Sequence, residues 1–136
     1  QIGTPEQVYG TPASTFVAGF IGSPPMNLIA GQAEGTRFVA GGQTLTLPAP
    51  APRNGPLLMG VRPEHADPDI GGSWAMKVEL LEMLGAERLV YGHLGDTMFT
   101  LRMESTRTPP KPGDTVMLGA VAPHVHWFDA TTGKRV

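Results

Sequence analysis

Glycine and proline punctuate this chain at short intervals, and their spacing is what most constrains its fold. The 136 residues include 18 Gly and 14 Pro, with short runs of alternating apolar and polar residues between them from Met26 onward. Alternation with a period of two is typical of strands that bury one face. No long amphipathic helix separates these runs, as it would in βαβ units. The sequence therefore predicts an all-β domain, a small barrel or a sandwich, with one core.

About eight segments fit the strand pattern. Two of them flank residues 41–42, Gly-Gly, whose freedom to adopt positive φ suits the turn of a two-residue hairpin. Further turns are expected at residues 84–86 and 95–96, and residues 48–56 form a proline-rich surface loop. In the strand at 97–103, the alternate residues from 99 onward share one apolar face. The expected strands are residues 37–40, 43–47, 57–62, 76–80, 88–91, 97–103, 116–118 and 124–128.

The first 22 residues predict two short helices instead. Thr4-Pro5 can cap and begin a helix, and Thr11-Pro12 repeats that signal before residues 13–20. The second helix must end within residues 22–25, because proline has no amide hydrogen to donate. Three apolar side chains lie at helical spacing on it, and we expect them to be exposed here because they pack on a domain outside this chain: Phe16, Val17 and Phe20.

Charge and composition argue against several classes of protein. The formal net charge is −2 with a pI near 6.1, and the ten Lys and Arg are scattered, which disfavours a nucleic-acid or anionic-membrane partner. The chain has no cysteine, so disulfides and thiolate chemistry are excluded. No apolar run approaches the roughly 20 residues of a membrane-spanning helix, and the first residues do not resemble a signal peptide. Because the chain opens at Gln1, we expect it to be a fragment of a longer protein.

The usual signatures of catalysis are missing from the sequence. ATP hydrolysis of the P-loop type needs a Gly-rich turn followed by Lys and then Ser or Thr. Here Gly133-Lys134 is followed by Arg135, and a surface turn is the expected structure. Residues 40–43 contain Gly-Gly-Gln, but an alternating strand follows them, so we assign a hairpin and no nucleotide role. The serines lack a nucleophile elbow. We therefore predict no catalytic and no cofactor-binding residue in this chain.

The histidines offer a metal site as an alternative. His124 and His126 lie two apart in an expected strand and would share a face, and His65 or His93 could add a third ligand. Nothing in the spacing requires a metal, and ordinary histidines on a polar barrel face are the simpler interpretation. We assign no metal ligand.

The segment Gly60-Val61-Arg62-Pro63-Glu64-His65 is the most distinctive in the chain. An apolar strand ends there in three ionisable side chains around a rigid proline, as in loops that fix an interface or a domain junction. A strand end with a satisfied Arg-Glu ion pair explains the same residues. The residues alone leave both interpretations open.

Five segments that occur together, in order, resemble one family. They are residues 1–5, 12–14, 16–24, 26–27 and 60–65. Their spacing is similar to that in the C-terminal third of the ATP-binding subunits of carbohydrate ABC importers, of the maltose and sn-glycerol-3-phosphate types. The resemblance covers nearly the whole chain. Residues 81–86 and the ending 126–136 resemble the sn-glycerol-3-phosphate type more closely.

This resemblance implies an OB-like small barrel of the transport-associated type, preceded by short N-terminal helices. Residues 1–22 would be the helical tail of an upstream nucleotide-binding domain, and residues 23–136 an OB-like regulatory and dimerisation domain. The family's motifs fall on eight residues here, for which the resemblance implies a junction or interface role and no catalysis: Ser23, Pro24, Met26, Asn27, Arg62, Pro63, Glu64 and His65.

The resemblance also implies partners and a location. Two copies would pair through the regulatory domain, while ATP and Mg²⁺ would bind the upstream domain and not this fragment. Permease subunits, a substrate-binding protein and a regulatory protein would complete the assembly, placing the chain in the cytoplasm at the inner face of a bacterial membrane. The alternative is an OB-like domain that senses a small ligand, an oxyanion or a sugar phosphate. No clustered set of cationic residues suits such a ligand.

Overall fold

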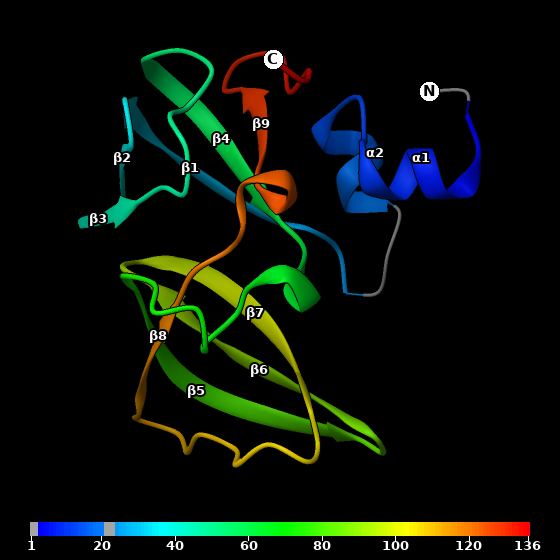
Figure 1. Cartoon of the computed structure of the whole chain (residues 1–136), viewed down its shortest axis with the longest axis vertical. Helices are drawn as coiled ribbons and strands as arrows, with labels where there is room; N and C mark the ends of the chain where they lie inside the picture. Colours follow the sequence, from blue (N-terminus) through cyan, green and yellow to red (C-terminus); the bar gives the residue numbers. More distant parts are fainter. Residues whose placement is uncertain (1–2, 21–23) are drawn as a thin grey trace.

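The computed structural model is almost entirely β-structure, with two short helices at its N-terminal end (Figure 1). It describes residues 3–20 and 24–136, without the side chains of residues 17, 19 and 20. The elements in chain order are α1 (Pro5–Gly10), α2 (Thr15–Phe20), β1 (Asn27–Glu34), β2 (Arg37–Ala40), β3 (Gln43–Thr46), β4 (Gly55–Val61), the 3-10 helix η1 (Pro63–His65), β5 (Trp74–Leu84), β6 (Glu87–Leu94), β7 (Thr97–Glu104), β8 (Thr115–Leu118), the 3-10 helix η2 (Ala122–His124) and β9 (His126–Asp129).

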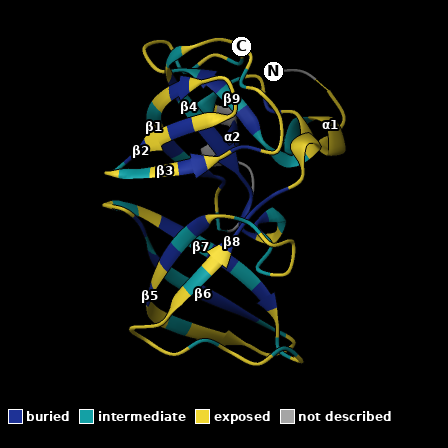
Figure 2. Ribbon diagram, turned by 60° about the vertical axis from the view of Figure 1, so that its left-hand side comes forward, coloured by how far each residue is buried: buried dark blue, intermediate teal, exposed yellow. Residues whose placement is uncertain are grey.

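The strands divide into two antiparallel sheets. Within the described residues, one sheet has the order β3-β2-β1-β4-β9 and the other β7-β6-β5-β8. The strands of both sheets are curved, and buried residues lie along the strands of both (Figure 2). The predicted fold class, all-β with short N-terminal helices, is confirmed. The sequence left open a barrel or a sandwich, and the structure has two separate sheets.

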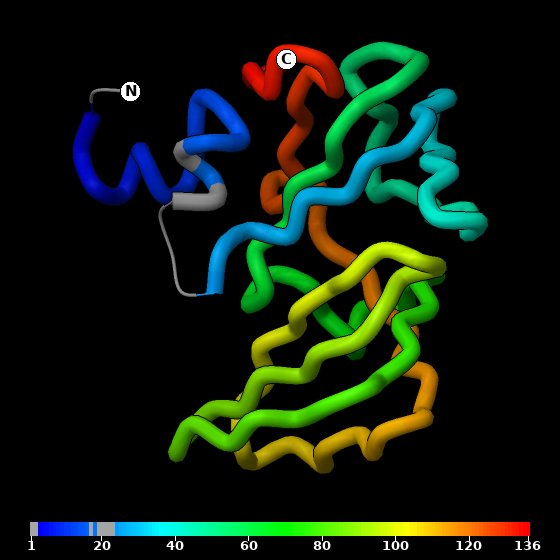
Figure 3. The backbone as a smooth tube through the Cα atoms, turned by 180° about the vertical axis from the view of Figure 1, so that it is seen from behind, coloured from blue at the N-terminus to red at the C-terminus, as the bar shows by residue number. Residues whose placement is uncertain are grey.

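The N-terminal helices follow the expected signals with one shift. Thr4 caps α1 in a capping box: its hydroxyl accepts from the Gln7 amide, and the Gln7 side chain accepts from the Thr4 amide. The second helix begins at Thr15, and not directly after Thr11-Pro12, because residue 14 bridges to Lys134 in the C-terminal tail. Figure 3 shows this tail beside the helical segment.

The central strand of the first sheet, β1, is absent from the predicted strands. Its sequence, NLIAGQAE, alternates only weakly, yet Ile29 and Ala33 reach the core. Gly31 is required where β1 meets β2, because a Cβ atom there would lie 2.5 Å from the carbonyl oxygen of Val39. The Gly41-Gly42 hairpin between β2 and β3 is confirmed, with positive φ at both glycines.

The second sheet is built on a hairpin longer than expected. Strand β5 runs to Leu84, past the predicted end at Leu80, and its register against β6 shifts between Val78 and Leu80. This bulge reverses which side chains face the core, so Val78 is 1% exposed and Leu80 is 59% exposed. The predicted apolar face of β7 is confirmed: Phe99, Leu101 and Met103 are all buried.

Polar side chains join the two sheets around a shared apolar core. The Trp74 indole donates to the carbonyl oxygen of Thr46 at 2.9 Å. The Gln43 amide pairs with both backbone groups of Ala75, at 2.8 and 3.1 Å. These bonds between side chains and backbone connect β3 of the first sheet to β5 of the second sheet. The core that they enclose draws on both sheets, including Ile29, Phe38, Leu57, Trp74, Phe99 and Leu101.

Two turn glycines give a test of this arrangement. Gly85 and Gly95 occupy matching positions in the two hairpins of the second sheet and have φ of 71° and 60°. A Cβ at Gly85 would meet no atom within 4 Å, whereas a Cβ at Gly95 would lie 2.1 Å from the carbonyl oxygen of Gly41 in the other sheet. We expect Gly85→Ala to cost about 1 kcal/mol of unfolding free energy and Gly95→Ala about 3 kcal/mol, measured by urea denaturation. Equal losses would show that the turns do not meet.

Candidate junction site

The structure separates the predicted junction residues into two groups. Ser23 lies outside the described residues, and Pro24 leads into β1. Met26 is buried with Ala18 of α2 and Phe128 of β9, so it helps to hold the second helix against the first sheet. Asn27 faces the second sheet instead, where its side chain donates to the carbonyl and accepts from the amide of Thr100, both at 2.8 Å. The remaining four residues, Arg62 to His65, form the second group.

Arg62 is the centre of this second group. It directly precedes η1 and is only 1% exposed. Its Nη1 donates to the carbonyl oxygen of Ala18 in α2 at 3.1 Å, and its Nη2 to that of Tyr9 in α1 at 3.0 Å. Carbonyls near helix C-termini lack partners within the helix, and they carry the negative end of the helix dipole. One guanidinium therefore binds the C-terminal ends of both helices.

Tyr9 connects Arg62 to Glu64. The guanidinium of Arg62 lies 4.0 Å from the centre of the Tyr9 ring, and the Tyr9 hydroxyl donates to a carboxylate oxygen of Glu64. Burial and this hydrogen bond raise the pKa of Tyr9 to about 12. Burial acts to raise the pKa of Glu64, but the bond from Tyr9 and the nearby His65 and Arg102 lower it below its usual value. The phenol stays protonated and the carboxylate ionised across the ordinary pH range.

The histidines around this group do not form the metal site considered above. His124 lies in η2 and not in the last strand, so the expectation that it shares a strand face with His126 is wrong. Its ring stacks on that of His65 with centroids 3.7 Å apart and planes 10° apart. Across the described residues, no group of three or more His, Asp or Glu is placed to hold a metal ion. Burial and then His124 lower the pKa of His65.

A second arginine holds the helical segment from the C-terminal tail. The Nε of Arg135 donates to the carbonyl oxygen of Pro12 at 2.7 Å, and its backbone amide donates to that of Ala13 at 2.8 Å. Its Nη2 lies 3.0 Å from the Nδ1 of His126. The turn expected at Gly133-Lys134 lies earlier, at residues 130–132, and Lys134 instead forms a β-bridge with residue 14. No sequence pattern predicted that Arg135 would reach back to the first helices.

Comparison with known proteins identifies the family of the chain. The family described as the MalK OB fold domain matches residues 22–66, and the family described as the TOBE domain matches residues 59–128, more than half of the chain. The chain belongs to the TOBE domain family. Among the described residues of this TOBE chain, no helix is long and apolar enough to cross a membrane.

Relatives with known names match the full length of the TOBE chain. A protein of Bordetella parapertussis, named sn-glycerol-3-phosphate import ATP-binding protein UgpC, is 44% identical over the whole chain, and proteins of the same name from Jannaschia sp. and Cereibacter sphaeroides are 39% and 40% identical. The chain spans only about 40% of the length of these relatives. The resemblance to the sn-glycerol-3-phosphate type is confirmed.

Three apolar side chains on the second helix of the TOBE chain were expected to be exposed, and the structure describes one of them. Phe16 is 76% exposed, as predicted. The side chains of Val17 and Phe20 lie outside the described part of the chain. Ala18, on the same helix, is fully buried against Met26 and Phe128, so α2 has one face on the first sheet and Phe16 on the outside.

His126 should make the stability of the TOBE chain depend on pH. Burial and then Arg135, with Arg62, His65 and His124 farther off, lower the pKa of His126 to about 4. An unfolded histidine titrates near 6.5, so between these values the unfolded chain binds more protons. His126 should leave stability unchanged above about pH 6.5 and reduce it by at most about 3 kcal/mol as the pH falls to 4.

A matched variant isolates this contribution. In His126→Gln the amide oxygen can still accept from Arg135 but does not titrate. The difference between the urea stabilities of the two proteins should change between pH 6.5 and 4 and stay constant above pH 7. A constant difference over the whole range would contradict the assignment to His126.

Proposed function

We propose that this chain is the non-catalytic regulatory and dimerisation segment of the ATP-binding subunit of an ABC importer for sn-glycerol 3-phosphate or a related carbohydrate. Relatives named for that import align with the whole chain at 39% to 44% identity, and it covers about 40% of their length. The remainder of such a subunit would bind ATP and Mg²⁺. This chain would then act on the ATPase through contacts and not through chemistry of its own.

The clamp that Arg62 makes is the observation that carries this proposal. It binds carbonyl oxygens of Tyr9 and Ala18 from a loop of the β-structure. We assign residues 1–22 to the tail of the upstream nucleotide-binding domain and residues 23–136 to the regulatory domain. Movement of the catalytic domain would then reach the sheets through the two helices, and the exposed ring of Phe16 would pack against that domain.

The same proposal places the chain in a larger assembly. Permease subunits would hold the ATPase at the cytoplasmic face of the membrane, a substrate-binding protein would deliver the solute, and a regulatory protein could dock on the sheets. A second copy would pair with this domain, and the exposed apolar side chains of Leu80, Met83 and Leu84 in the long β5–β6 hairpin offer surface for pairing.

Sedimentation of the ATP-binding subunit should give the mass of two chains, and the mass of a single chain would contradict pairing.

The test of the proposal is transport by the complete importer. In the assembled transporter, Arg62→Met should reduce solute uptake per ATP hydrolysed several-fold, because the helices lose their attachment to the sheets. The matched control is Arg53→Met, which removes a guanidinium from an ion pair with Asp129 at the surface. Uptake and ATP hydrolysis that are the same in both variants would contradict a coupling role, as would an upstream sequence with no ATP-binding motif.

A further inference from the structure

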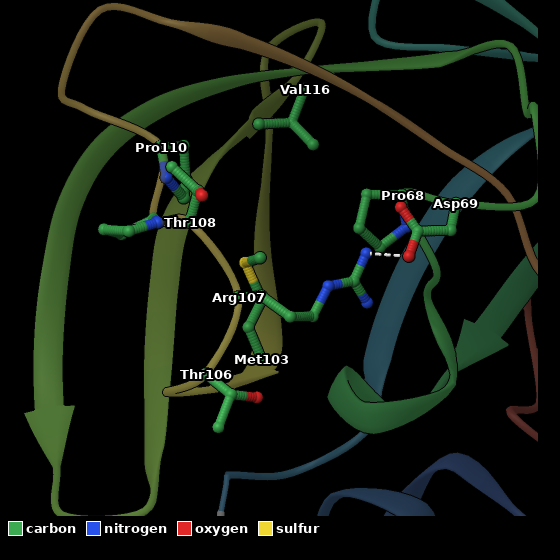
Figure 4. Close-up of a pocket in the computed structure, with 9 residues that line it drawn as sticks. Pro68, Asp69, Met103, Thr106, Arg107, Thr108, Pro110 and Val116 are labelled. Atoms are coloured by element: carbon green, nitrogen blue, oxygen red, sulfur yellow. Dashed lines mark ion pairs between the residues drawn. The ribbon is translucent and has the colours of Figure 1, made fainter.

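A cavity of about 550 Å³ lies beside the second sheet, next to the loop that follows η1 (Figure 4). Four parts of the chain line it: the loop after η1, the end of β7, strand β8 and the segment from residue 105 to residue 114, which we call the β7–β8 loop. Its volume is in the range of cavities that bind small molecules. The two strands contribute Met103 from β7 and Val116 from β8.

The β7–β8 loop is held from inside the sheet. Arg88 of β6 is 6% exposed, and its Nη1 and Nη2 donate to the backbone carbonyl oxygens of Arg107 and Ser105, both at 2.8 Å. Hydrogen bonds from a buried charged group are strong, so these two bonds from Nη1 and Nη2 fix the base of the loop. The wall of the cavity is therefore formed before any ligand arrives.

The opposite wall is fixed in a similar way. Asp67 and Gly119 exchange two backbone hydrogen bonds, of 2.7 and 3.1 Å, which attach the loop after η1 to the end of β8. The side chain of Arg107 reaches across the cavity mouth to this loop, where it forms an ion pair with Asp69 and lies 4.0 Å from Asp67. Figure 4 shows Arg107 and Asp69 meeting between the two loops.

The groups that line the cavity decide which class of ligand fits. The polar ones are the Arg107–Asp69 pair and the hydroxyls of Thr106 and Thr108, while the rest of the lining is proline, methionine and valine. The charges of Arg107, Asp67 and Asp69 sum to −1, and the guanidinium is already neutralised. A phosphate or carboxylate would meet two carboxylates and would have to displace Asp69.

A neutral hydroxyl group meets neither obstacle. One hydroxyl can donate to Asp69 while it accepts from Arg107, because it is both donor and acceptor, so the ion pair need not break. The two threonine hydroxyls can serve further hydroxyls in the same way. The C–H faces of a sugar or polyol would then pack against the apolar part of the lining, formed by Met103, Val116 and the three prolines, Pro68, Pro109 and Pro110.

We propose that this cavity binds a neutral polyhydroxylated molecule of monosaccharide or disaccharide size. Such a ligand bridges the β7–β8 loop and the loop after η1, the two segments that the ion pair of Arg107 connects at the mouth. The site does not depend on the proposed role in an importer, since none of its residues belongs to the junction.

The experiment is an amide NMR titration of this 136-residue chain with glucose, maltose and glucose 6-phosphate. Glucose or maltose should produce saturable shifts centred on residues 67–69 and 103–108. Asp69→Asn should weaken the binding of that sugar about tenfold, since it removes a charged acceptor and weakens the pairing of Arg107. Thr108→Val, which removes one hydroxyl and keeps the shape, should weaken it less. The matched control is Glu82→Gln, which removes an exposed carboxylate from the same sheet outside the cavity.

Several results would overturn the proposal. The first is the absence of saturable shifts with both neutral sugars, and the second is shifts centred on another surface. Tighter binding of glucose 6-phosphate than of glucose would show that the site prefers anions. An affinity unchanged in both Asp69→Asn and Thr108→Val would show that the lining groups are not the ligand's partners. If Asp69→Asn alters the spectrum beyond its own loop, the sugar affinity of Thr108→Val is compared with that of the native chain instead.

Discussion

One buried charge, the guanidinium of Arg62, holds both N-terminal helices to the β-structure. A charge withdrawn from water is tolerated only where hydrogen bonds and opposite partial charges replace the lost hydration. Here the replacement comes from the carbonyl oxygens of Tyr9 and Ala18 and from the face of the Tyr9 ring. The helices need the arginine to satisfy their C-terminal carbonyls, and the arginine needs the helices to remain buried. This mutual dependence explains how helices of six residues each stay in place on a β-structure.

The two sheets form a frame for the two proposed functional regions, which lie on connections between strands. Side chains of Gln43, Trp74 and Asn27 bond to the backbone of the opposite sheet and hold the sheets at one angle. The junction residues Arg62 to His65 occupy the connection after β4, and the cavity lies between the loop after η1 and the β7–β8 loop. A loop on a fixed frame can hold one conformation without regular secondary structure. Here the hydrogen bonds of buried Arg88 fix the β7–β8 loop in this way.

Local signals in the sequence predicted local structure well. The Gly-Gly hairpin, the capped first helix and the buried face of β7 depend on neighbouring residues, and all three are confirmed. Strand β1 was missed because Gly31 and the adjacent alanines weaken its alternation, and the end of β5 because a bulge has no sequence signature. The importance of Arg62 was visible, but its partners were not. They are backbone carbonyls 44 and 53 residues away, and a carbonyl is the same for every residue type. His124 was assigned to the last strand because the apolar and polar alternation of that strand extends back over it, whereas the structure has a 3-10 helix there.

The central claim is that Arg62 attaches the N-terminal helices to the β-structure. Hydrogen–deuterium exchange of the native chain and of Arg62→Met tests it directly, because exchange reports local opening separately from global unfolding. If Arg62 attaches the helices, residues 5–20 should lose protection in the variant, while β1, β4 and β6 keep theirs. Unchanged protection of the helices in Arg62→Met would contradict the claim. So would a uniform loss over all strands, since it would make Arg62 a general stabilising residue and not the attachment of the helices.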